Sequence, residues 1–158
     1  MEKYGQISIT IGTLGIVIAL MGVFPGIVGL EATEGIGVLQ VLVMLAGFSI
    51  LFSSAYVFVK QTFYPGLPTT LSQDIGLRLT LTGLLIAAAA GLADVLGFGS
   101  HPSTAASRPL LGRLQVMGFI GSLLLASAGV MIFALFGPHP SKEESPKGET
   151  IPPNGENG

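Results

Sequence analysis

The sequence predicts an all-α integral membrane protein whose fold is a bundle of four transmembrane helices. Three observations carry this prediction. Hydrophobic residues make up 49 % of the 158 residues and charged residues only 10 %, whereas soluble domains carry about 25 % charged residues. The mean hydropathy is +0.73. The few charges stand mostly outside four long apolar segments. Much of the protein surface is therefore expected to face lipid and not water.

The first two apolar segments, residues 7–30 and 36–59, are each 24 residues long and hold no charge. A helix rises about 1.5 Å per residue, so about 20 residues cross a hydrocarbon core of about 30 Å. Outer-membrane strands would instead alternate in polarity over about 10 residues. Only residues 31–35 connect the two segments, which predicts an antiparallel hairpin. Pro25 is expected to kink the first helix near its end.

The third segment, residues 76–98, has Arg78 near its start and Asp94 near its end. Ser72 stands where an N-cap of this helix is expected. The fourth segment, residues 114–136, again holds no charge. Both segments are long enough to span a bilayer as helices.

The four predicted helices form one transmembrane domain over residues 1–136, and the polar residues 137–158 predict a disordered tail. With the N-terminus in the cytoplasm, that side collects Lys3, Lys60, Arg78, Lys142 and Lys147, and the opposite side holds Arg108 and Arg113. The positive-inside rule therefore predicts that both termini, and the tail, are cytoplasmic. Tyrosines favour the membrane interfaces, where we expect Tyr4, Tyr56 and Tyr64.

Small residues follow a helical stripe along the first segment, at spacings of three and four: Gly12, Gly15, Ala19, Gly22, Gly26 and Gly29. The third segment repeats this pattern with Gly76, Thr80, Gly83, Ala87, Ala90, Asp94 and Gly97. Helices in lipid associate through close van der Waals contact, which small residues permit. Glycine is common in transmembrane helices in general. Composition alone does not produce this spacing twice, so we interpret both stripes as helix-packing seams.

The second and fourth segments begin alike. Residues 37–41 read Gly-Val-Leu-Gln-Val and residues 112–116 read Gly-Arg-Leu-Gln-Val, and the same register aligns Phe58 with Phe133. One interpretation is a duplicated helical hairpin, whose two copies would be related by a pseudo-twofold axis along the membrane normal. The other is chance similarity between apolar helices, and the sequence leaves both open.

Four polar residues are predicted at similar depth near one membrane surface: Asp94, Arg113, Gln40 and Gln115. An ionisable group inside a membrane is by default a hypothesis of function. In one interpretation they form an outward-facing pocket in which Asp94 binds a cation or a proton. In the other, which we favour, Asp94 pairs with Arg113 and the glutamines form hydrogen bonds across helices.

Several kinds of chemistry lack the residues they need. The chain has no cysteine, and His101 and His139 lie outside the apolar segments, so we expect no thiolate metal site, no bis-histidine haem and no other cofactor. No basic cluster could follow a nucleic acid backbone. We also find no catalytic set, and the acidic pair Glu31 and Glu34 stands on a turn, so the chain is not expected to be an enzyme.

These observations favour a non-catalytic accessory or scaffold subunit of a larger membrane complex, with the lipid bilayer and other membrane subunits, or further copies of itself, as partners. The alternative is a small oligomeric transporter or channel with Asp94 in an outward-facing polar pocket. A transporter of this size is expected to bury a charge near the midplane, and Asp94 lies off-centre. A membrane enzyme acting on lipid or quinone ranks third, because we find no nucleophile or metal set for it.

Overall fold

The computed structural model describes residues 2–29, 37–93, 95–97 and 112–138. In these residues it is all-helical, with no strand, and its elements are α1 (Glu2–Val23), the 3-10 helix η1 (Pro25–Val28), α2 (Val38–Phe63), α3 (Leu71–Gly91) and α4 (Arg113–Leu135). Each of the four α-helices contains a segment long and apolar enough to cross a membrane. The predicted multi-pass membrane protein with four spanning helices is therefore confirmed.

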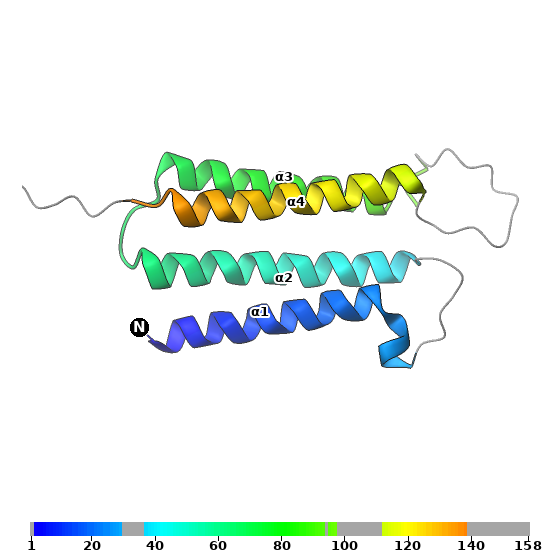
Figure 1. Cartoon of the computed structure of the whole chain (residues 1–158), viewed down its shortest axis with the longest axis horizontal. Helices are drawn as coiled ribbons and strands as arrows, with labels where there is room; N and C mark the ends of the chain where they lie inside the picture. Colours follow the sequence, from blue (N-terminus) through cyan, green and yellow to red (C-terminus); the bar gives the residue numbers. More distant parts are fainter. Residues whose placement is uncertain (1, 30–36, 94, 98–111, 139–158) are drawn as a thin grey trace, which may run out of the picture.

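The helices are arranged as two antiparallel hairpins, α1 with α2 and α3 with α4 (Figure 1). Helix α2 lies between its hairpin partner and the second hairpin, and it contacts both α3 and α4. Helix α1 packs chiefly against α2. The start of α1 and the end of α4 lie at the same end of the molecule (Figure 1). The bundle is therefore layered, with one helix that has a single main neighbour.

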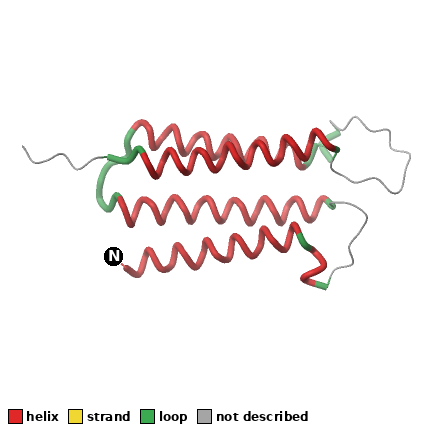
Figure 2. The backbone as a smooth tube through the Cα atoms, viewed as in Figure 1, coloured by secondary structure: helices red, strands yellow, loops and turns green. Residues whose placement is uncertain are grey.

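Helix α1 ends at Val23, before the predicted limit at residue 30. Pro25 therefore follows the end of the helix and does not kink it, as the sequence analysis had predicted it would. Proline has no N–H to donate, and its ring collides with the carbonyl one turn earlier. The last helical bond of this run joins Phe24 N to Leu20 O at 2.8 Å. From Pro25 the chain forms η1, which turns away from the helix axis (Figure 2) and ends at Gly29 with φ 75°.

Helix α3 begins at Leu71 and ends at Gly91, earlier at both ends than predicted. Its N-cap is Thr70 and not Ser72, because Thr70 and Gln73 form a reciprocal capping box. The Thr70 Oγ1 accepts from Gln73 N at 3.3 Å, and Gln73 Oε1 accepts from Thr70 N at 3.3 Å. Hydropathy marks where a segment is apolar, whereas these local bonds mark where the helix begins.

Helix α2 extends beyond its predicted end at residue 59 to include Lys60. The Lys60 Nζ donates to Leu67 O at 2.7 Å, in the loop that follows the helix. A lysine near a helix end can reach polar surroundings along its flexible stem. The charge is therefore compatible with the last turn of this helix. The acidic turn residues 31 and 34, and the predicted tail beyond residue 138, lie outside the described residues.

The two hairpins are packed in equivalent register. A Cβ on Gly15 would lie 2.9 Å from the carbonyl oxygen of Gly47, in the helix that faces it. A Cβ on Gly83 would lie 2.6 Å from the carbonyl oxygen of Ser122. Ser122 follows Gly47 by the same offset that aligns residues 112–116 with residues 37–41. The likeness seen in the sequence therefore extends to the contacts that close each hairpin.

The hairpins meet through an apolar cluster of Val41, Met44, Ala87 and Phe119. Met44 and Phe119 occupy equivalent positions in the repeat register, so this part of the interface resembles the expected twofold arrangement. The arrangement is not symmetric as a whole, because α2 contacts both helices of the second hairpin and α1 packs chiefly on α2.

Candidate functional site

The predicted seam of α1 faces α2 over four of its six positions. Gly12, Gly15, Ala19 and Gly22 are all buried. A Cβ on Gly22 would lie 2.8 Å from the backbone nitrogen of Met44, so the two helices approach at backbone distance. Such close approach maximises van der Waals contact where lipid supplies no hydrophobic driving force.

The other two positions of this seam, Gly26 and Gly29, lie beyond the end of α1 and do not take part in the contact. A Cβ at either would meet no atom within 4 Å. The helix ends before them because of Pro25, so their spacing no longer places them on the helix face. The stripe read from the sequence is therefore longer than the contact it forms.

The seam of α3 faces α4. Gly83 and Ala87 are buried, and Ala90 is half-buried. Gly129 on the facing helix has equally little space, because a Cβ added there would lie 2.5 Å from Gly76 O. Both helices thus contribute small residues to this contact. Gly97 lies beyond the end of α3, and Asp94 lies outside the described residues.

The predicted polar cluster is only partly described. Gln40 and Gln115 each use their Oε1 to accept from the backbone N–H of their own N-cap, at 2.5 Å from Gly37 N and 2.6 Å from Gly112 N. These oxygens therefore close the first turn of their own helices. The expected bonds of the two glutamines across helices stay a prediction. Arg113 is exposed as the first residue of α4. The pairing with Asp94 lies outside the described residues.

A polar relay that the sequence analysis did not identify joins three helices inside the bundle. The hydroxyl oxygens of Tyr56 and Thr80 are 2.6 Å apart, and Thr80 Oγ1 donates to Ala126 O at 2.8 Å. Either hydroxyl can donate in this contact, and Tyr56 OH also lies within donating distance of Gly76 O, at 3.0 Å. Tyr56 is half-buried in α2, and its hydroxyl joins the two hairpins. Its expected place at a membrane interface stays a prediction.

A second polar group binds the end of α4. The last carbonyls of a helix have no donor within it. Here Gln73 Nε2 donates to Phe133 O at 3.4 Å, and Tyr64 OH donates to Ala134 O at 2.8 Å. Thr70 Oγ1 donates to Phe136 O just beyond the helix, at 3.0 Å. The segment that connects the two hairpins therefore caps the last helix, and no motif in the sequence signals that role.

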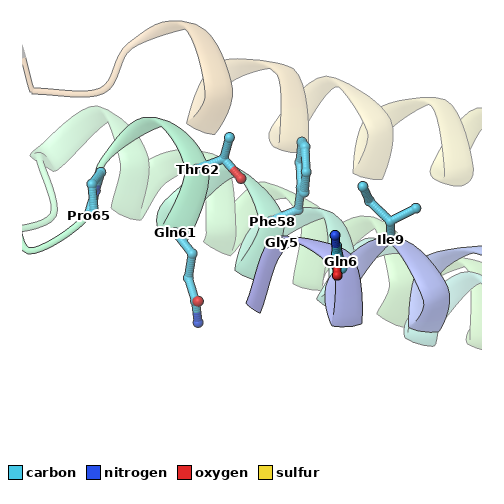
Figure 3. A pocket seen from close by; sticks show the side chains of 7 residues that line it. All are labelled: Gly5, Gln6, Ile9, Phe58, Gln61, Thr62 and Pro65. Atoms are coloured by element: carbon cyan, nitrogen blue, oxygen red, sulfur yellow. The ribbon is translucent and has the colours of Figure 1, made fainter. Parts of the chain in front are cut away.

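A groove of about 480 Å³ lies between the beginning of α1 and the end of α2 (Figure 3). It is lined by Gly5, Gln6, Ile9, Phe58, Gln61, Thr62 and Pro65. Its walls combine apolar side chains with two amides and a hydroxyl. None of these residues belonged to a predicted site.

The described residues pair their buried polar side chains. Among them, every buried side-chain nitrogen or oxygen has a hydrogen-bond partner, and no group of three or more His, Asp or Glu residues could hold a metal ion. Buried polar groups in lipid are costly unless they are paired. Comparisons with protein-family models, with curated proteins and with solved structures find no match.

Proposed function

We propose that this small integral membrane protein is a non-catalytic accessory or scaffold subunit of a larger membrane complex. The observation that carries the proposal is the use made of its buried polar groups. The Tyr56–Thr80 relay and the bonds from Tyr64 and Gln73 to α4 all hold helices to one another. A pathway or a reaction centre would need polar groups that remain available to a substrate.

The outer surface supports the same proposal. In each of the four spanning helices, only 22 to 28 % of the most apolar stretch of 18 residues is buried inside the molecule. Helix α1 has one main neighbour, so most of its circumference is available to lipid or to another protein. Its exposed side chains include Ile7, Leu14 and Leu20. Other membrane subunits, together with lipid, are the partners that such a surface suits.

The test is purification of the full chain from its native membrane in a mild detergent, followed by mass spectrometry of the proteins that migrate with it. Stoichiometric migration with other membrane proteins supports the proposal. Migration as a monomer or as a homo-oligomer contradicts it.

In that second case the sequence-based alternative, a transporter that uses Asp94, becomes the hypothesis to test. A reconstituted Asp94→Asn variant should then lose flux and still assemble. If Asp94 instead forms a structural pair with Arg113, Asp94→Asn lowers thermal stability. Neutralising Arg113 as well then restores part of it.

A further inference from the structure

Two charged side chains lie on the outward face of α3. Asp74 and Arg78 are both exposed, and a spacing of four residues places them one turn apart on the same side of the helix. Gly76, midway between them, faces the other way, because a Cβ added there would lie 2.6 Å from Gly129 O of α4. Leu85, two turns beyond Arg78 on the outward face, is 73 % exposed. The two charges therefore stand on a side of α3 that is turned away from α4.

These two charges lie at different depths in the spanning segment. Helix α3 has 21 residues, so its length of about 30 Å matches the hydrocarbon core, and Leu71 lies near the membrane surface at which α1 begins (Figure 1). Along the helix axis, Asp74 is about 4.5 Å and Arg78 about 10.5 Å from Leu71. Side chains on a helix lean toward its N-terminus, so Arg78 extends toward the same surface. The carboxylate of Asp74 is thus nearest to water, and the guanidinium of Arg78 lies beneath it.

Both charges need partners at this depth. The spacing permits an ion pair between them, but among the described residues neither Asp74 nor Arg78 forms an ion pair. A charged group that faces lipid is costly, and a long basic side chain near a helix end lowers this cost by reaching the headgroup layer. A guanidinium binds a phosphate through two parallel N–H···O bonds. The phospholipid headgroups are therefore the counter-charges that this face of α3 can reach.

We propose that Asp74 and Arg78 bind the headgroup of a phospholipid that carries one phosphate and one primary ammonium, as in phosphatidylethanolamine. In such a lipid the phosphate lies next to the apolar chains, and the ammonium lies further out, at the end of a two-carbon linker. The protein presents the complementary order, with Arg78 beneath Asp74. The guanidinium donates to the phosphate, and the ammonium donates to the carboxylate. Leu85 then faces the apolar chains below the headgroup.

The pair of charges distinguishes this headgroup from two others. A phosphatidylglycerol headgroup offers a phosphate to Arg78 but no cation to Asp74, and the carboxylate repels its negative charge. The trimethylammonium group of phosphatidylcholine is a cation without an N–H, so it cannot donate to the carboxylate. Of the three, phosphatidylethanolamine satisfies both side chains. The inference concerns lipid and does not depend on the proposed function as a subunit.

The test is native mass spectrometry of the full chain, purified in a mild detergent and incubated with equal amounts of these three lipids. We expect adducts of phosphatidylethanolamine to dominate. Arg78→Gln should reduce them about fivefold, whereas the matched control Arg78→Lys, which keeps the positive charge, should retain most of them. Asp74→Asn should keep phospholipid adducts but remove the preference for phosphatidylethanolamine over phosphatidylglycerol.

Four outcomes overturn the site. They are equal retention of the three lipids by the unmodified chain, unchanged adducts in Arg78→Gln, an unchanged lipid preference in Asp74→Asn, and loss of adducts in Arg78→Lys as large as in Arg78→Gln. Unchanged adducts together with lower thermal stability of Arg78→Gln and Asp74→Asn in lipid-free micelles would assign the two charges to each other. Unchanged adducts together with loss of a co-purifying protein in Arg78→Gln would assign this face to a protein contact and leave the subunit proposal standing. Retention of phosphatidylethanolamine by a chain that co-purifies with no other protein contradicts the subunit proposal alone.

Discussion

Replacing Gly83 by alanine tests the close packing of α3 against α4. The added Cβ would lie 2.6 Å from Ser122 O and 2.7 Å from Ala126 N. Both are backbone atoms, so no side chain can rotate away. Ordinary contact begins at 3.4 Å, and the two helices must therefore separate by about 0.8 Å at this point.

A separation of that size weakens the contacts along the rest of the seam. A gap of about 0.5–1 Å removes about a quarter to a half of the dispersion energy of each atom pair that it affects. Overpacking of a well-packed core costs about 1–3 kcal/mol. We expect the free energy of unfolding of Gly83→Ala to be lower by that amount than that of Gly121→Ala, an alanine replacement at an open position of α4. Gly15→Ala should cost about as much, because its Cβ would meet Leu51 N at 2.7 Å.

The matched control is Gly121→Ala in α4, where a Cβ meets nothing within 4 Å. Both replacements gain the same intrinsic helix propensity, about 1 kcal/mol relative to glycine. The difference between the two variants therefore isolates the packing term. It can be measured by SDS titration in detergent micelles, with far-UV circular dichroism as the signal because the chain has no tryptophan. Equal stability of Gly83→Ala and Gly121→Ala would refute the close-packing explanation.

Three further predictions concern hydrogen bonds. Tyr56→Phe and Thr80→Val should each lower the free energy of unfolding by about 0.6 kcal/mol, with about 1.7 kcal/mol as the upper bound. The double variant should lose less stability than the sum of the two single losses, because both single variants remove the same 2.6 Å contact. Gln40→Ala and Gln115→Ala should lose about 0.5–1 kcal/mol each, in equal amounts, since each Oε1 caps its own helix. Tyr64→Phe should cost about 1 kcal/mol and speed hydrogen exchange in the last turn of α4, where Ala134 O loses its donor.

Each of these has a distinguishing outcome. Thr13→Val is the control for the relay, because Thr13 is exposed and its hydroxyl donates to Ile9 O in its own helix. It should change stability by less than about 0.5 kcal/mol. Additive losses at Tyr56 and Thr80 would contradict the relay. Unequal losses at the two glutamines would contradict the equivalence of the two hairpins, and unchanged exchange in Tyr64→Phe would show that α4 does not depend on this cap.

The number and type of the spanning helices could be predicted from hydropathy, because a segment of about 20 apolar residues has few stable alternatives to a helix in lipid. The ends of the helices could not be predicted in this way. Pro25 ends α1 early and the Thr70–Gln73 pair starts α3 early. Both effects depend on single backbone bonds, to which a hydropathy average is insensitive.

The small-residue spacing indicated which faces of α1 and α3 to examine, since a period of three and four residues lies on one side of any helix. It did not indicate the limit of the contact, as Gly26 and Gly29 show. The Tyr56–Thr80 relay was missed because the two residues stand on different helices, 24 positions apart. A threonine in the middle of a small-residue stripe was the available signal for it.

Composition and periodicity were sufficient to predict that lipid surrounds this chain, how many spanning helices it has and on which side two of them pack. These properties are local and repeat along one segment. The shared start of α2 and α4 also pointed to a repeat. The layered order, the covering of one hairpin end by Tyr56 and Tyr64 and the open groove at the other depend on which surfaces meet. Those contacts join residues far apart in the chain, and only the packed arrangement brings them within bonding distance.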